Sequence, residues 1–160
     1  MPARKSLSHV DPRGRVRMVD VGDKTETDRE AVASARIRVS KAALSAVRRG
    51  AVKKGDPLQI ARVAGIMAAK RTSDLIPLCH PLALSNVDVD IRPRPWGYEL
   101  RAVVRTRGRT GVEMEALAAV TIAALTIYDM LKAVDRAMTI DRVCVLEKRG
   151  GRSGHYRRTV

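Results

Sequence analysis

Residues 87–105 read VDVDIRPRPWGYELRAVVR, and they contain two candidate strands joined by a turn. Residues 87–91 alternate valine or isoleucine with aspartate, a period of two that is typical of a strand with one face toward the core. Residues 93–97 contain two prolines and a glycine, which predict a turn. Residues 98–105 predict the returning strand. This stretch therefore predicts an antiparallel hairpin near the middle of the chain.

The sequence on both sides of the hairpin completes the pattern. Residues 29–39 alternate as well and predict a strand, after which Ser40 and Asp56 are each placed to cap a helix. The expected elements, in order, are strand 29–39, helix 41–49, helix 57–70, hairpin 87–105, a helix from 111 to about 136, and a strand around 143–145. This order predicts an α+β fold of the ferredoxin-like βαββαβ type, an antiparallel sheet with helices packed on one face.

Length and composition predict one domain. A chain of 160 residues with 45% hydrophobic content can bury a sizeable core. We expect a single domain over residues 17–155, a flexible basic tail over 1–16 and a short C-terminal tail over 156–160. The two cysteines are far apart and lack CxxC spacing, so neither a disulfide framework nor a metal site is indicated. The polar N-terminal residues argue against a signal peptide and favour a cytoplasmic protein.

Positive charge is concentrated in the tails. The formal net charge is +14, of which residues 1–17 carry +4 and residues 148–160 carry +5. The remainder is only modestly basic, which suits a small anionic substrate as well as a nucleic-acid backbone. An RNA-binding module of this architecture needs aromatic side chains on its middle strands, yet the chain has no phenylalanine, one tryptophan and three tyrosines. Nucleic acid is therefore not the expected partner. The alternative interpretation of the protein, which stays open, is a basic module that binds nucleic acid or phosphate.

The last expected helix is unusually apolar. Residues 116–128 are apolar on nearly every helical face, interrupted only by Thr121 and Thr126. One small sheet cannot cover such a helix, and 13 residues are too few to cross a bilayer. We therefore expect another subunit, rather than a membrane, to cover it, so that the protein is a homo-oligomer.

Charged side chains stand at both ends of this helix: Glu113 and Glu115 at its start, Asp129 and Lys132 near its end. Two interpretations stay open. Acids favour a helix N-terminus, and Asp129 can form an ordinary surface pair with Lys132. Alternatively, Asp129 belongs to a site, because a carboxylate that follows an apolar stretch needs partners. Glu115 and Asp129 lie about 21 Å apart along a helix, so if both contact one ligand, different subunits must supply them.

The segment Leu78-Cys79-His80 lies between Pro77 and Pro81. Each proline stiffens the backbone, and stiff backbone can aim an imidazole. A lone histidine among leucines is nevertheless more often a hydrogen-bonded core residue, and Cys79 is more often a small buried apolar residue than a nucleophile. The segment alone does not choose between these interpretations.

Basic residues outside the tails form a second candidate set. Guanidinium and ammonium groups suit phosphate, although each residue alone can be a solvated side chain. A lysine that faces a carboxylate in a partly buried pocket can also act as an acid or a base. The members of this set are Arg29, Lys54, Lys70, Arg71 and Lys132.

Several motifs together match one known family. They are MVDV at 18–21, KGD at 54–56, AKRT at 69–72, DLIPLCHPL at 74–82, TGVEMEA at 110–116 and LTIYDM at 125–130. At these residues, which span nearly everything between the tails, the chain closely resembles the cyclic pyranopterin monophosphate synthases, the molybdenum cofactor biosynthesis protein C family. The family's ending, a lysine followed by Gly-Gly-Lys-Ser-Gly, appears at 148–154 with Arg152 in place of the second lysine. Arginine keeps the charge but not the proton-transfer chemistry of lysine.

This resemblance implies a lyase that converts (8S)-3',8-cyclo-7,8-dihydroguanosine 5'-triphosphate to cyclic pyranopterin monophosphate and releases pyrophosphate. It implies that Asp129 is the catalytic carboxylate, with Lys132 and Lys54 as its proton-transfer partners. The substrate-binding residues that it implies are Leu78, Cys79, His80, Met114, Glu115, Glu113, Arg29, Lys70, Arg71 and Lys148. It also implies that no cofactor is required, leaves open whether a divalent ion accompanies the triphosphate, and predicts a hexamer, a trimer of dimers, with sites at subunit interfaces.

Overall fold

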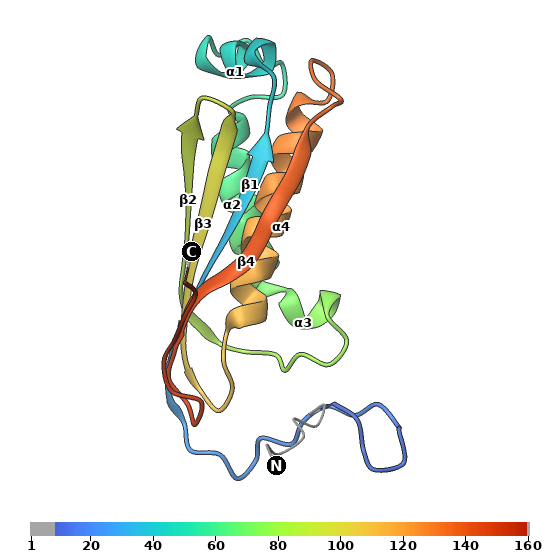
Figure 1. Ribbon diagram of the computed structural model, residues 1–160, viewed down its shortest axis with the longest axis vertical. Helices are drawn as coiled ribbons and strands as arrows, with labels where there is room; N and C mark the ends of the chain where they lie inside the picture. The colour runs from blue at the N-terminus through green and yellow to red at the C-terminus, as the bar shows by residue number, and fades with distance from the viewer. Residues whose placement is uncertain (1–8, 160) are drawn as a thin grey trace.

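Five strands form one antiparallel sheet, and helices cover one of its two faces (Figure 1). The computed structural model describes residues 9–159. Its elements are β1 (Thr27–Arg38), α1 (Lys41–Arg48), α2 (Pro57–Lys70), α3 (Thr72–Leu75), β2 (Leu84–Arg94), β3 (Gly97–Gly108), α4 (Glu113–Leu131), β4 (Thr139–Arg149) and β5 (Tyr156–Arg157). The strand order is β2-β3-β1-β4-β5. The predicted α+β, ferredoxin-like arrangement is confirmed.

The central strand β1 supplies the floor of the core. Ala31, Ala33, Ala35 and Ile37 alternate along it and are fully buried. All four pair with β3 on one side. Ala31, Ala33 and Ile37 also pair with β4 on the other side, where the ladder is irregular in two places. The small side chains allow a helix to approach the sheet closely, which is why this strand carries alanines rather than larger residues.

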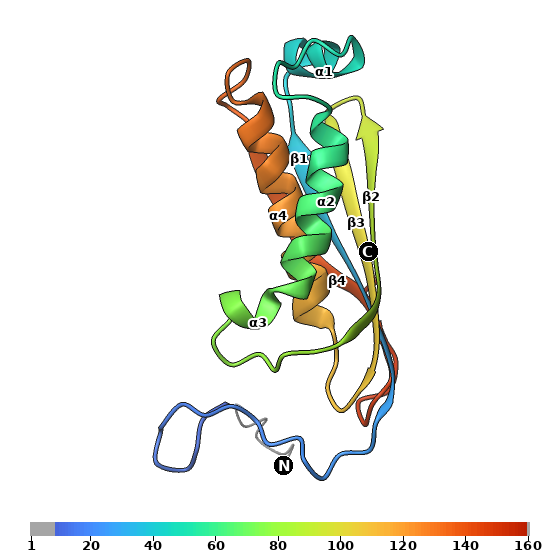
Figure 2. The same cartoon turned by 180° about the vertical axis from the view of Figure 1, so that it is seen from behind.

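The helices α2 and α4 lie side by side over the sheet and run in opposite directions (Figure 2). A Cβ atom added to Gly65 of α2 would lie 2.9 Å from the carbonyl oxygen of Ala119 and 3.3 Å from the Cβ of Ala123. It would also lie 3.3 Å from a methyl group of Val89 on β2. The two helices therefore approach as closely as they do because position 65 has no side chain.

Replacing Gly65 by valine is expected to lower the free energy of unfolding by about 1–3 kcal/mol, the usual cost of overpacking a core. The nearest neighbour is a backbone oxygen that cannot rotate away. Urea unfolding followed by circular dichroism measures the change. Gln59→Val, at an exposed position of the same helix, is the matched control and should cost only the propensity difference, about 0.5 kcal/mol. Equal losses in both variants would contradict the close-packing argument.

Within residues 9–159, α4 is the one helix long and apolar enough to cross a membrane. It has 19 residues and is therefore longer than the apolar stretch 116–128 that the sequence shows. Half of its most apolar window is buried inside the domain, where α4 is the core helix. Leu125 is 52% exposed and Met114 is 37% exposed. The chain therefore covers its own apolar helix only in part.

The end of α4 and the presence of α3 differ from what the sequence predicts. α4 ends at Leu131 rather than near residue 136, because the Asp135 carboxylate accepts hydrogen bonds from the backbone N–H groups of Ser40 and Ala137 at 2.7 and 2.9 Å. The chain must leave the helix to place this carboxylate at the start of α1. The short helix α3 was not expected; its first residue, Thr72, donates its hydroxyl to carbonyl groups of the last turn of α2.

The hairpin turn is tighter than expected. β2 continues to Arg94 and β3 begins at Gly97, so only two residues form the turn. Gly97 has a φ of +147°, and a Cβ atom at this position would overlap the carbonyl group of Ile37. Only glycine fits there. At the other end of the chain, β5 lies within the 156–160 segment and pairs with β4.

Candidate active site

Charged side chains at the two ends of α4 meet different parts of the chain. Because α2 runs antiparallel to α4, the turn that precedes α2 lies beside the end of α4, and the residues that follow α2 lie near its start (Figure 2). The spacing between Glu115 and Asp129 corresponds to about 21 Å along the helix axis. The two groups of charged residues are therefore separate within one chain.

At the end of α4, Asp129 lies between two lysines. Its carboxylate oxygens are 2.7 Å from the Nζ of Lys132 and 3.1 Å from the Nζ of Lys54. Lys54 also donates to the backbone carbonyl of Asp129 at 3.4 Å, close to the negative end of the helix. The hydrogen bond from Lys132, followed by the one from Lys54, holds the pKa of Asp129 below its ordinary value. We call these three residues the carboxylate–lysine cluster; all three side chains are about half exposed.

The start of α4 borders a pocket of about 430 Å³, which we call the Cys79 pocket. The segment between the two prolines forms one wall and the first turn of α4 forms another. Its lining includes Leu78, Cys79, His80, Glu113, Met114, Glu115 and Lys24. Glu115 is only 4% exposed, and burial, with a smaller effect from the charge of Glu113, raises its pKa. Burial, and then the nearby Glu115 charge, raises the pKa of the Cys79 thiol, so the thiol is not an activated nucleophile.

A second pocket, of about 610 Å³, lies next to the first, and we call it the Arg29 pocket. The two pockets share Lys24 and the 110–111 turn. The cations that line the Arg29 pocket are Lys24, Arg29, Arg109, Lys148, Arg149 and Arg152. Against them stand Asp23 and Glu113. The excess of positive charge makes this pocket suitable for a multiply charged anion.

Glycines position Arg29 in this pocket. Its guanidinium donates to the carbonyl oxygens of Gly108 and Arg109 at 3.4 and 3.3 Å. Gly150 and Gly151 have φ values of +94° and +76°, and a Cβ atom at Gly151 would overlap the guanidinium. Among the described residues, no group of three or more histidine, cysteine or acidic side chains is placed to hold a metal ion.

Comparison with known proteins identifies the family. A model of the MoaC family matches residues 18–151. The chain belongs to the MoaC family. It is 60% identical to the cyclic pyranopterin monophosphate synthase of Thermomicrobium roseum over 95% of this chain and 93% of that protein. The synthases of Chloroflexus aggregans (58%, covering 95% and 93%) and Peptoclostridium acidaminophilum (52%, covering 95% and 97%) are similarly close. The resemblance inferred from the motifs is confirmed.

The structure brings the predicted residues of this MoaC chain together in two groups. Asp129, Lys132 and Lys54 form the first. The second lines the two adjoining pockets and contains Leu78, Cys79, His80, Glu113, Met114, Glu115, Arg29 and Lys148. Lys70 and Arg71 are exposed at the end of α2, on the same side of the domain as the pockets, but line neither of them. Their roles stay predictions.

Sequence reasoning did not assign Lys24, or Arg109 and Thr110 of the 107–111 loop, to the candidate site. Lys24 lines both pockets, yet it lies in a polar segment without periodicity, so nothing local indicates its position. The loop was interpreted only as the start of a helix. Its arginines and glycines before a helix N-terminus are a recognisable anion-binding signal, and that signal could have added Arg109 and Thr110.

Replacing Glu115 by glutamine is expected to stabilise this MoaC chain at neutral pH. Because burial raises the pKa of Glu115, the folded chain keeps the proton to a higher pH than the unfolded chain does. Wild-type stability therefore falls as the pH rises from the unfolded-state pKa through the folded-state pKa. Glutamine does not ionise, so the variant does not lose stability in this way as the pH rises. Denaturant unfolding at several pH values and one protein concentration measures the free energy of unfolding of the variant and of the wild type. The difference between the two should be absent at low pH and grow as pH rises. A difference that stays constant with pH would contradict this account.

Proposed function

We propose that this chain is a cyclic pyranopterin monophosphate synthase, a lyase of molybdenum cofactor biosynthesis. It converts (8S)-3',8-cyclo-7,8-dihydroguanosine 5'-triphosphate to cyclic pyranopterin monophosphate and releases pyrophosphate. The observation that carries this proposal is the 52–60% identity, over nearly the whole chain, to proteins with that name. The two pockets and the carboxylate–lysine cluster supply the chemical groups that such a reaction needs.

The Arg29 pocket holds the triphosphate. Its guanidinium groups offer planar pairs of donors, and Lys148 adds an ammonium group that hydrogen-bonds to Ser153. Donors that are already positioned before the reaction stabilise charge on the departing pyrophosphate. Two carbonyl groups hold the guanidinium of Arg29 in this pocket. Lys70 and Arg71 extend the positive surface around the pocket.

The Cys79 pocket holds the purine-derived part of the substrate. It adjoins the triphosphate pocket through Lys24, so one ligand can reach from one pocket to the other. His80 offers a ring nitrogen to the ligand, and Leu78 and Met114 offer apolar contact. Burial raises the pKa of Glu115, which favours its protonated form compared with an exposed glutamate and suits this side chain to donate a proton to the ligand.

The carboxylate–lysine cluster carries out proton transfer. Asp129 is a carboxylate whose pKa Lys132 and Lys54 lower further, and an ionised carboxylate at this position can accept a proton as a base. Each lysine, in contact with the carboxylate at 2.7 or 3.1 Å, can return a proton to the ring as it rearranges. General acid–base chemistry of this kind requires no redox cofactor.

Two copies of the chain complete one site. The separation along α4 prevents the cluster from reaching the Cys79 pocket of its own chain. If α4 packs antiparallel against α4 of a second copy, the cluster of each copy meets the pocket of the other. Ile60, Val63 and Met67 of α2 are 40%, 57% and 49% exposed and follow a helical stripe on the same layer. This apolar surface suits such an interface, and three of these dimers form the proposed hexamer.

The cellular location that we propose is the cytoplasm. Cys79 and Cys144 are both free thiols, as is usual for a protein of a reducing compartment.

The experiment that tests the function supplies the purified protein with the cyclised nucleotide and follows two products at once. Pyrophosphate release and formation of the pterin product in equal amounts are expected, with and without a chelator of divalent ions. A folded oligomer that yields neither product would contradict the proposal. Pyrophosphate without pterin would indicate simple hydrolysis and would also contradict it.

A further inference from the structure

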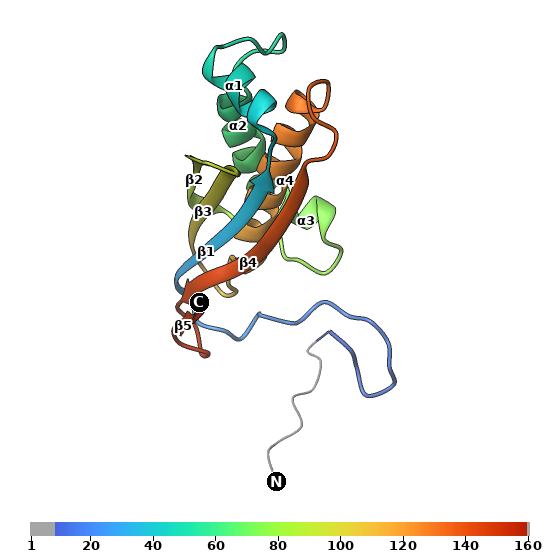
Figure 3. The same ribbon diagram turned by 45° about the horizontal axis from the view of Figure 1, so that its top comes forward.

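Helices leave one face of the sheet uncovered (Figure 3). This face carries a groove of its own. The groove has a volume of about 620 Å³ and reaches from β2 and β3 across β1 and β4 to the C-terminal segment. It shares no lining residue with the Cys79 or Arg29 pocket. Its charged side chains are one acid, Glu99, and five arginines: Arg36, Arg92, Arg101, Arg142 and Arg158.

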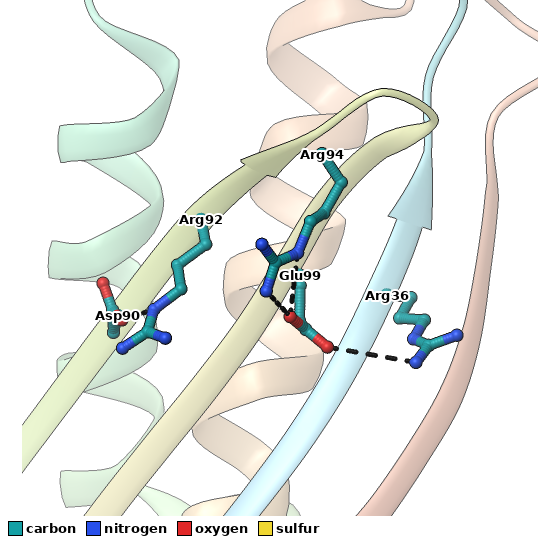
Figure 4. A network of polar contacts seen from close by, with 5 residues as sticks. All are labelled: Arg36, Asp90, Arg92, Arg94 and Glu99. Atoms are coloured by element: carbon teal, nitrogen blue, oxygen red, sulfur yellow. Dashed lines mark hydrogen bonds and ion pairs between the residues drawn. The ribbon is translucent and has the colours of Figure 1, made fainter.

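Acidic side chains form ion pairs with only some of these arginines (Figure 4). Arg92 contacts Asp90 at 2.6 Å, and Glu99 lies 3.9 Å from Arg36 while it pairs with Arg94. The other three arginines of the groove form no ion pair with any residue in 9–159: Arg101, Arg142 and Arg158. Within residues 9–159, the groove therefore has an excess of positive charge that acidic side chains do not neutralise.

Hydrogen bonds hold Arg158 in place, and an unusual backbone conformation directs Arg142. The backbone N–H of Arg158 donates to Leu146 at 2.8 Å, and its side chain donates to Val145 at 3.0 Å, so the C-terminal segment is held against β4. Arg142 has a φ of +51°, which is uncommon for a residue with a side chain. The β1–β4 ladder is irregular nearby, and irregularities of this kind redirect side chains.

The floor between the arginines is small and weakly polar. Ser34, Cys144 and Leu146 contribute to it, and the Ser34 hydroxyl lies 3.6 Å from the Cys144 sulfur. All five cations are arginines, whereas the cluster that we assign to proton transfer uses lysines. A guanidinium binds phosphate oxygens in pairs and also stacks on flat aromatic rings. A weakly polar floor, guanidinium groups that can stack on a ring, and excess positive charge suit a ligand with a planar ring and several phosphates.

We propose that this groove binds a nucleoside triphosphate, separately from the reaction site. The base lies over the floor near Cys144, and the phosphates lie among Arg101, Arg142 and Arg158. The volume of the groove is within the range of small-molecule sites, about 300–1,000 Å³. This proposal does not depend on the reaction assigned to the chain, and its test does not measure turnover.

The two cysteines make a direct test possible, because one lies in this groove and the other in the Cys79 pocket. The intact protein is treated with a thiol-alkylating reagent, and mass spectrometry follows modification of each cysteine separately. ATP, used as the probe with EDTA present, is expected to slow alkylation of Cys144. Tripolyphosphate is expected to require at least about tenfold higher concentration for the same protection, because it lacks the base. Equal protection by both anions would overturn the nucleoside part of the proposal.

A double variant, Arg101→Gln with Arg142→Gln, is expected to raise the ATP concentration for half protection of Cys144 by about tenfold or more. Any protection of Cys79 by ATP should stay unchanged in this variant. Arg49→Gln, at an exposed arginine at the end of α1, is the matched control. It should change the protection of neither cysteine by ATP. Unaltered protection of Cys144 in the double variant would overturn the proposal. So would a Cys144 that does not react at all in the native protein, since the groove would then be closed to ligands.

Discussion

Replacing Asp129 by asparagine is expected to lower kcat by about 10²–10⁴-fold, the usual contribution of general acid–base catalysis. Asparagine has nearly the same shape but carries no charge and cannot take up the proton. The carboxylate that Lys132 and Lys54 contact would be lost, while the pockets at the other end of α4 would be intact. The measurement is the steady-state rate of pterin formation, together with the KM for the cyclised nucleotide.

The control for this variant is Arg71→Ala, which removes a cation near the pockets but leaves the cluster alone. We expect it to raise KM and to change kcat little, because a phosphate contact acts on substrate and transition state alike. Denaturant unfolding should show both variants folded. An equal rise of KM in the two variants, with kcat preserved in both, would contradict the role given to Asp129.

Mixed oligomers of two variants with lowered activity are expected to regain about one quarter of the wild-type activity. Asp129→Asn removes the cluster of its own chain, and His80→Ala changes the Cys79 pocket of its own chain. If each site takes these two parts from different copies, random assembly gives both intact parts to about one site in four. Coexpression of equal amounts of the two variants, followed by the pterin assay, measures this recovery.

A second mixture is the control for this experiment. Asp129→Asn and Lys132→Ala both alter the same cluster of the same chain, where the two side chains are 2.7 Å apart. No random assembly of these two variants can produce an intact cluster, so no recovery is expected. Recovery in neither mixture would contradict the shared site and would require one chain to hold both parts.

The order of strands and helices could be predicted because the sequence alternates clearly in 29–39 and 87–105. The end of α4 could not, since it depends on a hydrogen bond from Ser40 to Asp135 across 95 residues. α3 depends on Thr72, whose hydroxyl bonds back to the preceding helix. Contacts of this kind leave no periodic trace in the sequence.

The candidate site, like the fold, could be predicted only where it depends on local spacing. Asp129 and Lys132 are three residues apart on a helix, so their contact follows from spacing alone. Lys54 contacts Asp129 from 75 residues away, and only the antiparallel packing of α2 and α4 brings it there. The family resemblance supplied this residue, whereas Lys24, which lines both pockets, was found only in the structure.

The two outer edges of the sheet have a consequence for how the protein behaves at high concentration. On one edge, β2 carries charged residues and a proline, Pro93, which cannot donate a hydrogen bond to a neighbouring strand. On the other, β5 has only two residues, and β4 beyond it is bent where Arg142 has a positive φ. Neither edge offers a long flat strand to another chain. The sheet therefore resists sideways, fibril-like polymerisation.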